Sequence, residues 1–326
     1  MSVASSPDPK KKKSKLAQIY RQRNFYLMVL PAVIYAFVFS YLPMSGLLMA
    51  FKVYRFNTPS LFGDVPILRF LGQMLNMEWA GLDWFSKLFA KPDYIMAVRN
   101  TLIISFGRLL IEFPCPIILA LLLNEVMQSK IKRIYQTVYT FPHFLSWVLI
   151  ATIMTRMLVS DGLVNNVINA FGGESVKFLL EPGIFRGVIF ASSIWKGAGW
   201  GSIIYLATIS GIDPTLYEAA IIDGANRWQR VRFITWPSIK PTVVILLILQ
   251  SGTVLNGGFD QIFNLYNTQV YSVADIIDTF IYRFAFEKAQ NLSLTVAAGL
   301  LKAVVNFLFL LTVNTIARWL GEEGLL

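Results

Sequence analysis

The sequence has almost none of the side chains that most often build metal and catalytic centres. Its 326 residues include one cysteine, Cys115, and one histidine, His143. A single cysteine excludes an internal disulfide, and one cysteine with one histidine cannot build a typical zinc site. The same shortage leaves no Cys–His pair and no histidine-based triad for nucleophilic catalysis. We therefore expect no metal site and no catalytic residue.

A phosphate-binding loop is also missing. No segment matches the pattern G-x-x-x-x-G-K-[ST], in which backbone amides and a lysine hold nucleotide phosphates. We therefore expect this chain neither to bind nor to hydrolyse ATP, and to need no cofactor of its own.

Charged residues are few and unevenly placed. They make up 15% of the chain, against 55% hydrophobic residues, whereas soluble domains carry about 25% charged residues. The net charge of +10 does not indicate a nucleic-acid partner, because many basic residues cluster in 10–23, just before the first long apolar run. Such a cluster marks the cytoplasmic side of a membrane helix. The composition therefore predicts a membrane protein that contacts lipid and binds no nucleic acid.

Six apolar segments are long enough to cross a membrane, which takes about 20 mostly apolar residues in a helix. The first is too long for the core of a signal peptide, so we expect it to be retained as a span. The sequence predicts an all-α membrane protein with six transmembrane helices. They lie roughly at 25–51, 95–123, 134–159, 187–210, 241–263 and 292–316.

The distribution of Lys and Arg predicts the orientation. With both termini inside, the inner segments hold 15 of these residues and the outer segments hold 9, an asymmetry that favours cytoplasmic termini. We therefore expect a basic cytoplasmic tail at 1–24, a transmembrane domain at 25–316 and a short cytoplasmic tail at 317–326.

The cytoplasmic loop at 211–240 contains helix signals of its own. Asp213 can cap a helix whose first residue is Pro214, and Gly224 can end it in the left-handed conformation. A second short, basic helix follows and stops before Pro237. The first helix is too short to be stable alone in water, so it needs a surface to pack on. The pattern alone leaves two alternatives: the loop binds a partner protein through its short helices, or it is an ordinary surface loop.

This loop resembles the EAA loop of ABC importer permeases, which inserts into a cleft of the ATPase subunit. The match consists of Glu218-Ala219-Ala220, Gly224, Ile234 and Pro237, with Trp236 where the family usually has leucine. The resemblance implies a cytoplasmic coupling helix. It assigns ATPase coupling to Leu216, Tyr217, Glu218, Ala219, Ala220, Gly224, Ile234 and Pro237.

Further stretches resemble the polysaccharide-type branch of the carbohydrate-uptake permeases. They are Pro31, Tyr41-Leu42-Pro43-Met44, the run from Pro116 to Glu125, Pro142-His143-Phe144, Ile212-Asp213-Pro214 and Asp275-Ile276-Ile277-Asp278-Thr279. This resemblance implies a multi-pass permease of the bacterial cytoplasmic (inner) membrane. Its expected partners are a second, different permease, an ATPase dimer that binds ATP and Mg, an external or periplasmic solute-binding protein and a saccharide substrate.

Polar residues inside the spans are candidates for the substrate path, because ionisable groups in a bilayer usually face a bundle interior or a water-filled cavity. The candidates are Arg108, Glu112, Trp195, Lys196, Trp200, Asn256, Asp260 and Lys302. Each also has a structural alternative. Arg108 and Glu112 can pair at i,i+4, and the lysines can pair with Glu112 or Asp260. The mid-span cations would suit an acidic polymer such as alginate or pectate fragments.

A secondary transporter driven by an ion gradient is the main alternative from another class. It would show repeated halves and a relay of acidic residues inside the membrane. We find no convincing repeat in the sequence, and Glu112 is one of few mid-span acids. These observations favour the ATP-driven importer.

Overall fold

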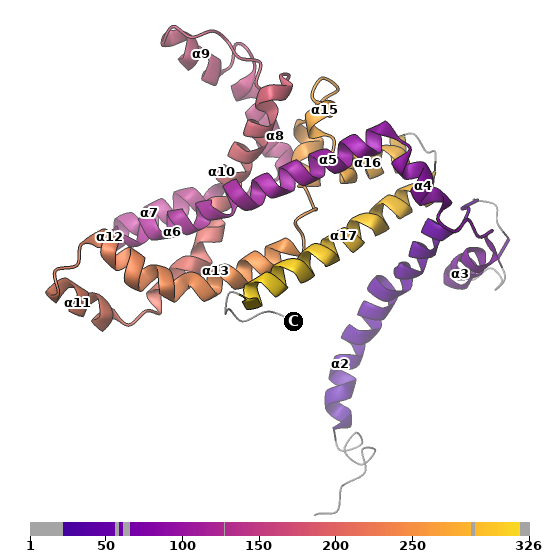
Figure 1. The fold of residues 1–326 in the computed structure, drawn as a ribbon, viewed down its shortest axis with the longest axis horizontal. Coiled ribbons are helices and arrows are strands. Elements are labelled where there is room, and N and C mark those ends of the chain that lie inside the picture. Colours follow the sequence, from indigo (N-terminus) through magenta and orange to yellow (C-terminus); the bar gives the residue numbers. More distant parts are fainter. Residues whose placement is uncertain (1–21, 56–58, 61–65, 127, 288–290, 320–326) are drawn as a thin grey trace, which may run out of the picture. The chain divides into compact units, whose positions relative to one another are not determined.

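The computed structural model describes residues 22–55, 59–60, 66–126, 128–287 and 291–319. Within this part every named element is a helix, which confirms the predicted all-α class (Figure 1). Most of the two predicted tails, at 1–24 and 317–326, lies outside the described residues. The chain divides into two compact units, Met1–Trp79 and Ala80–Leu326, and each is described by itself.

The first unit contains one long helical segment. It runs through α2 (Arg23–Ala36), η1 (Phe37–Tyr41) and η2 (Leu42–Phe51), and a shorter helix, α3 (Pro66–Asn76), follows. The segment Arg23–Phe51 is long and apolar enough to span a membrane. Most of its large hydrophobic side chains are exposed, as expected of a helix that lies against lipid. The first predicted span is therefore confirmed in length and composition.

The second unit holds four more helical segments that satisfy the same length and hydropathy criteria: Pro92–Asn124, Trp147–Ala170, Arg227–Ser251 and Leu292–Trp319. The described part thus has five such segments, against six predicted spans. The fourth predicted span, 187–210, is not among them; it corresponds to α10 (Pro182–Ser210), which is 29 residues long. It falls short in hydropathy because Lys196 and several glycines and serines dilute its apolar residues.

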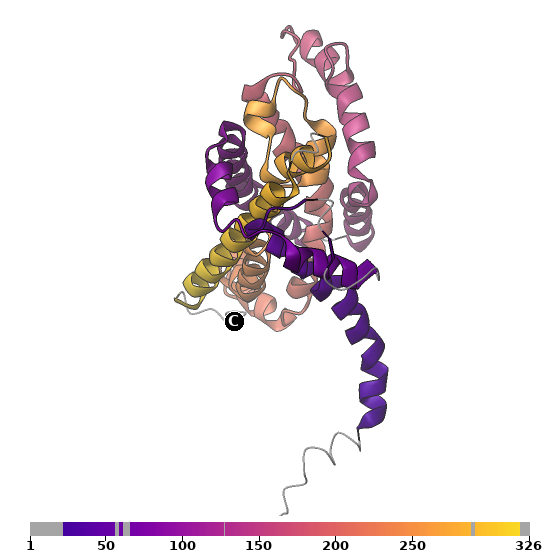
Figure 2. The same ribbon diagram turned by 90° about the vertical axis from the view of Figure 1, so that its right-hand side faces the viewer.

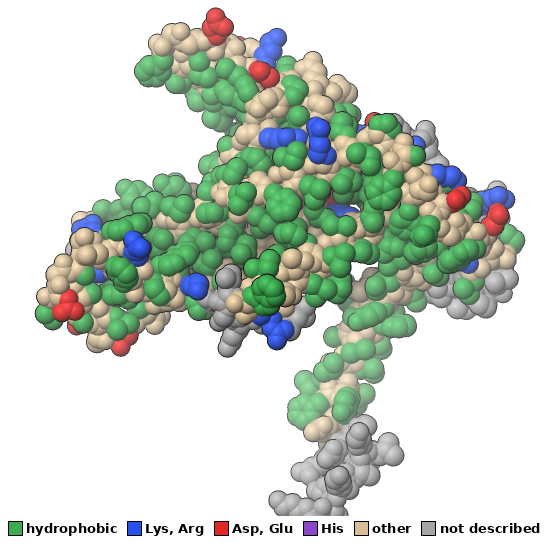
Figure 3. All heavy atoms as spheres, in the orientation of Figure 1, with side chains coloured by type: hydrophobic (Ala, Val, Ile, Leu, Met, Phe, Trp, Pro, Cys, Tyr) green, Lys and Arg blue, Asp and Glu red, His purple; other side chains and the backbone are tan. Residues whose placement is uncertain are grey.

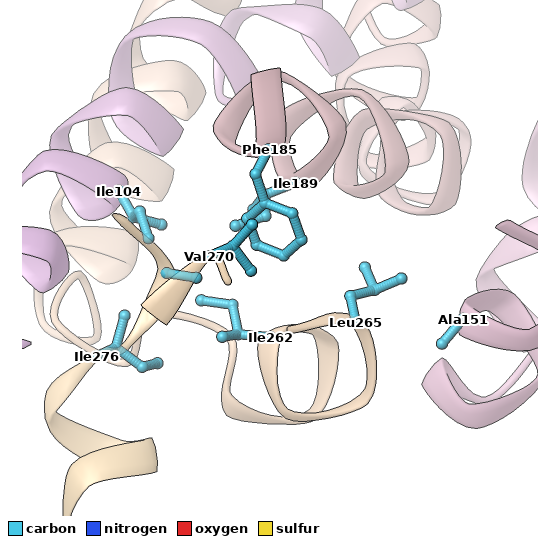
Figure 4. Close-up of a cluster of buried hydrophobic side chains, with 9 residues drawn as sticks. Ile104, Ala151, Phe185, Ile189, Ile262, Leu265, Val270 and Ile276 are labelled. Atoms are coloured by element: carbon cyan, nitrogen blue, oxygen red, sulfur yellow. The ribbon is translucent and has the colours of Figure 1, made fainter. Parts of the chain in front are cut away.

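Helix α10 is the central element of this unit (Figures 1 and 2). On one side it packs against α6 (Pro114–Asn124) and α13 (Trp236–Ser251), where Ile117, Tyr205 and Ile239 are buried together. On another side it contributes Phe185 and Ile189 to a buried cluster that also holds residues of α5 (Pro92–Gly107), α8 (Trp147–Leu158) and α14 (Phe259–Leu265). Figure 4 shows this second cluster, in which Val270 and Ile262 lie near Phe185 and Ile189, and Leu265 and Ala151 lie farther along it.

The predicted third span, 134–159, is wrong as a single helix. The structure has α7 (Ser129–Thr140), a short 3-10 turn η4 (Phe141–Phe144) and then α8, which the Ser146 side chain caps. The break contains Pro142, which restricts the residue before it and cannot donate a backbone hydrogen bond. Helix α9 (Leu163–Ala170) continues on from α8.

The predicted fifth span, 241–263, is also wrong in its second half. Helix α13 begins at Trp236 and ends at Ser251, and α14 begins only at Phe259. Between them Gly258 adopts a φ of 78°, in the left-handed region that favours glycine. The long helix has therefore ended before the two glycines, Gly257 and Gly258.

The connection from α14 to α17 (Leu292–Trp319) folds back onto α5 and α10 through α15 (Tyr271–Ala274), α16 (Ile277–Tyr282) and η6 (Arg283–Glu287). A buried ion pair holds it together: both terminal nitrogens of Arg283 donate to the Asp275 carboxylate, at 3.1 and 2.6 Å. The Asn100 amide of α5 donates to the backbone oxygen of Asp275. This buried polar network was not predicted from the sequence.

Candidate functional site

The loop between α10 and α13 has the two short helices that the sequence predicts. Helix α11 (Pro214–Ile222) begins after Asp213, whose side chain accepts a hydrogen bond of 2.9 Å from the backbone amide of Thr215. This hydrogen bond holds the pKa of the Asp213 carboxyl below its usual value. Gly224, with a φ of 78°, ends the turn. Asn226 and Gln229 then form a capping box at the start of α12 (Arg227–Arg230).

Helix α11 presents apolar side chains to solvent. Leu216, Ile221 and Ile222 are 51%, 55% and 86% exposed, and Glu218 and Ala219 are exposed as well. A helix of this length with exposed apolar side chains is typical of a docking element. In the space-filling view acidic side chains gather near this helix (Figure 3). Among the other predicted coupling residues, Pro237 is exposed, whereas Ala220 and Ile234 are partly buried.

Tyr217 connects α11 to the next helical segment. Its hydroxyl lies 2.9 Å from the hydroxyl of Thr235, which is 1% exposed and ends the π-helical turn η5 (Val231–Thr235). Because η5 leads directly into α13, this contact ties α11 to the start of a long apolar helix. The sequence assigned Tyr217 to a partner's cleft and did not indicate Thr235.

A cavity of about 400 Å³ lies between α6, α10 and α13. Its polar lining includes Glu112, Ser193 and Gln250, and Gly197 and Gly201 of α10 leave room for it. The Ser193 hydroxyl donates to the Glu112 carboxylate at 2.7 Å. Of the predicted path residues, Glu112 therefore does line a cavity, whereas Gln250 was missed although it lies within a predicted span.

Arg108 and Glu112 belong to one turn, η3 (Arg108–Glu112). The Arg108 Nε lies 3.7 Å from the Glu112 carboxylate, which confirms the predicted i,i+4 pairing. A terminal nitrogen of Arg108 also donates to the side-chain oxygen of Gln261 at 2.5 Å, and the Gln261 amide donates to Ser192 of α10 at 2.9 Å. The guanidinium occupies the space that a side chain at Gly258 would need. Arg108 therefore links η3 to α14 and to the break that precedes it.

Lys196 donates hydrogen bonds to backbone oxygens in the break between α7 and α8. Its ammonium donates to the backbone oxygens of His143, at 2.8 Å, and Leu145. It also lies 5.5 Å from the ring centre of Trp147. Neither Glu112 nor Asp260, the partners considered from the sequence, contacts it. The nearby Trp200 stacks on the His143 ring at 4.6 Å and Trp195 is 43% exposed, so aromatic surface is available beside this lysine.

Lys302 has a different partner from those predicted. Its ammonium lies 2.6 Å from the Asp278 carboxylate of α16, and the two side chains are 11% and 22% exposed. Glu112 and Asp260 were therefore the wrong choices. The ion pair favours the structural alternative for Lys302 over a place in the substrate path.

Asn256 and Asp260 do not share a helical face, because the helix has ended at Ser251. Asn256 lies in the break and Asp260 in the first turn of α14, and both side chains are exposed. Neither contributes to the lining of the cavity between α6, α10 and α13. The exposure of their side chains is the one observation that supports a role for Asn256 and Asp260 in the substrate path.

Comparisons with known proteins agree on one family. A family model for the inner membrane component of binding-protein-dependent transport systems matches residues 112–322. The chain is 41% identical over 316 residues to the polygalacturonan/rhamnogalacturonan transport system permease protein YteP of Bacillus subtilis (strain 168), covering 97% of this chain and 94% of that protein. It is 40% identical to protein LplB of the same organism over 311 residues, covering 95% and 93%.

Two solved structures are also similar. One is a bacterial ABC transporter involved in the import of the acidic polysaccharide alginate, with 39% identity, a TM-score of 0.82 and coverage of 93% of this chain and 98% of that chain. The other is a bacterial alginate ABC transporter in complex with a periplasmic protein bound to an alginate pentasaccharide. It has 38% identity, a TM-score of 0.85 and coverage of 96% and 100%.

The Lys302–Asp278 ion pair generates a stability prediction. Lys302→Met keeps the aliphatic stem and leaves the Asp278 carboxylate without its partner, so the protein should lose roughly 1.5–3 kcal/mol of stability. Adding Asp278→Asn removes the unpaired charge and should restore most of the loss. Thermal unfolding of the purified protein in detergent, monitored by size-exclusion chromatography, measures both effects. A double variant no more stable than Lys302→Met would contradict the structural role.

Proposed function

Because the chain belongs to the inner membrane components of binding-protein-dependent transport systems, we propose that it forms, with a second and different permease, the membrane path for an acidic oligosaccharide or polysaccharide. The family makes it a multi-pass membrane protein and the non-catalytic permease subunit of an importer. It also excludes the ion-gradient-driven transporter considered from the sequence. ATP and Mg would bind to partner ATPase subunits.

The observation that carries the substrate proposal is the similarity, over nearly the full length, to proteins named for acidic polymers. The relatives transport polygalacturonan/rhamnogalacturonan and alginate, and both groups of polymers contain uronic acids. Identity near 40% with TM-scores above 0.8 extends over the helices that hold Glu112, Lys196 and Gln250. The cavity between α6, α10 and α13 offers hydrogen-bonding groups and room for part of a sugar chain.

A chain of contacts leads from the docking helix to this cavity. Tyr217 ties α11 to η5 and hence to α13. Both α13 and α10 line the cavity, and beyond the break at Gly258 the network of Gln261 and Arg108 connects α14 to η3. When ATPase subunits close on α11, α13 would shift against α10 and reshape the cavity. The proposed coupling residues are those that the EAA resemblance assigns.

We propose that six helices cross the membrane, with α10 as the sixth beside the five more apolar ones. Glycine and Lys196 are tolerated in α10 because it is the central helix, packed against α6, α7 and α13, and its charge is satisfied by backbone oxygens. An even number of spans, with the basic 1–24 segment inside, leaves both termini in the cytoplasm.

The direct test of the proposed function is uptake by the transporter reconstituted in liposomes with its second permease, ATPases and binding protein. Uptake of oligogalacturonate or alginate trimers should require ATP and the binding protein, and a neutral maltotriose should not be taken up. Glu218→Lys and Gly224→Val should abolish uptake of the acidic trimers. The first reverses a charge on the docking helix, and the second forces a β-branched residue into a left-handed turn. Uptake of maltotriose in preference to both acidic trimers would contradict the acidic substrate.

The Tyr217–Thr235 contact predicts a coupling defect without loss of assembly. Tyr217→Phe removes only the hydroxyl and one hydrogen bond, worth about 1 kcal/mol, so the variant should still bind the ATPases. We expect the transporter with Tyr217→Phe to hydrolyse more ATP for each sugar transported, and Thr235→Val should have the same effect. Thr235→Ser keeps the hydroxyl, so its ratio of ATP hydrolysed to sugar transported should match that of the unsubstituted transporter. Tyr135→Phe, at an exposed tyrosine of α7, is the matched control. If the ratio of ATP hydrolysed to sugar transported is unchanged in both Tyr217→Phe and Thr235→Val, the contact does not contribute to coupling.

The topology can be tested by cysteine labelling in a Cys115→Ser background. A membrane-impermeant maleimide added outside should label cysteines placed at Gly172 and Gln269. It should not label one at Asn226, since the loop at 211–240 faces the cytoplasm in our proposal. Labelling of the Asn226 position in intact cells would invert the orientation and remove the basis for coupling through α11.

A further inference from the structure

A second cavity lies on the other side of α10, against α7 and η4. It has a volume of about 320 Å³, which is within the usual range for small-molecule sites. The part of its lining that carries chemistry is Arg133, Gln136, Thr137, Thr140, Phe141 and Phe144. We call it the α7 groove. It shares no lining residue with the cavity that contains Glu112.

Helix α7 is polar along one side and apolar along the other. Arg133, Gln136 and Thr140 recur at steps of three and four residues, which places them on one face. The opposite face carries Ile134 and Val138, both 61% exposed, as suits contact with lipid or a partner subunit. Polar side chains at membrane depth persist where they meet water, a polar partner or a ligand. The polar face of α7 therefore needs such a neighbour.

Two polar groups of the groove have no partner among the residues that the structure describes. The Thr140 hydroxyl oxygen is buried and no described residue hydrogen-bonds to it. Such an unsatisfied group in a native fold calls for an explanation. The Arg133 guanidinium has no hydrogen bond and no ion pair with any residue in the described ranges. It differs in this from Arg108 and Arg283, which both have side-chain partners.

The other end of the groove is aromatic. Phe141 and Phe144 are 62% and 70% exposed, and Phe144 packs edge-on against Trp200, with the ring centres 5.8 Å apart. Sugar rings present apolar C–H faces that pack well on exposed aromatic rings, while their hydroxyls bond to groups such as Thr140 and Gln136. An arginine fork recognises a carboxylate with two parallel hydrogen bonds. The groove thus combines aromatic rings, neutral hydrogen-bonding side chains and an arginine along roughly 10 Å of helix.

We propose that the α7 groove is a second saccharide subsite, in which Arg133 binds the carboxylate of a uronate unit and Phe141 and Phe144 hold sugar rings. This inference rests on the proposed import of an acidic saccharide and adds where one charged unit binds. The groove runs along α7 from Arg133 into η4. Because α7 begins just after the inner loop at 124–128, we place Arg133 in the cytoplasmic half of the path.

The test compares uptake of oligogalacturonate trimer with that of its methyl ester, in which the carboxylates are neutral but the sugars are the same. Arg133→Gln should reduce uptake of the acidic trimer about tenfold, the equivalent of one charge-assisted hydrogen-bonded contact. Uptake of the ester, expressed relative to the unsubstituted transporter, should change far less. Arg133→Lys keeps the positive charge but cannot form the two parallel hydrogen bonds of a guanidinium. Its uptake of the acidic trimer should therefore lie between that of the unsubstituted transporter and that of Arg133→Gln. Lys130→Gln, on the same helix but outside the groove, should transport normally.

Thr140→Val supplies a second measurement that does not depend on charge. Because its hydroxyl has no protein partner, the variant should assemble normally and be no less stable. It should nevertheless reduce uptake of both trimers about threefold, since one neutral hydrogen bond to the sugar is lost. A merely structural role for the groove would lower stability and leave the uptake per assembled complex unchanged.

The outcomes separate the two proposals. Normal uptake of the acidic trimer by Arg133→Gln, matching Lys130→Gln, would overturn the subsite and leave the proposed function standing. No uptake of either trimer by the unsubstituted transporter would overturn the proposed function. Equal losses for the acidic and esterified trimers that vary with the anionic lipid content of the liposomes would assign Arg133 to a lipid headgroup, and would also overturn the subsite.

Discussion

The structure of the Ala80–Leu326 unit depends on one constraint: backbone groups freed by breaks in its helices must find partners where water is scarce. The carbonyls exposed between α7 and α8 accept hydrogen bonds from Lys196. The Leu255 amide, in the break after α13, donates to the Asn306 side chain. At the turn from α15 to α16 the Ile277 amide donates to the Thr101 hydroxyl. Each interruption is thus closed by a polar side chain from another helix, as the low polarity of a bilayer requires.

This constraint changes how the charged residues of the spans are to be understood. The Lys196 ammonium already donates to two backbone oxygens, and the Lys302 ammonium is paired with the Asp278 carboxylate. Both lysines therefore have fewer N–H groups left to donate to a ligand. Glu112 Oε1 lies 3.7 Å from the Arg108 Nε but has no hydrogen bond among the described residues, and the Arg133 guanidinium has neither a hydrogen bond nor an ion pair with them. Groups of this second kind are better candidates for contact with substrate than the mid-span lysines.

Much of the fold was predictable because its signals are local. Asp213, Pro214 and Gly224 mark the bounds of α11 through capping and backbone preference, which act within a few residues, and the structure has the helix there. The spans at 25–51 and 292–316 follow from their length and high mean hydropathy. The third span was misjudged because proline is tolerated in membrane helices, so Pro142 alone did not predict that the helix would stop. The Arg108–Glu112 pair was predictable because its members are one turn apart.

The sequence by itself determined that the chain is helical and membrane-spanning, that a short helix lies between α10 and α13, and, through the family it resembles, that catalysis and ATP binding belong to other subunits. Only the tertiary structure decided which polar residues are free. Gln261 meets Arg108 across 153 positions of the chain and Lys302 meets Asp278 across 24. Helical periodicity shows which residues share a face, but it cannot show which face of another helix lies opposite. That depends on how the helices pack around α10, and so does the choice between a charge held by the protein and a charge left for a ligand.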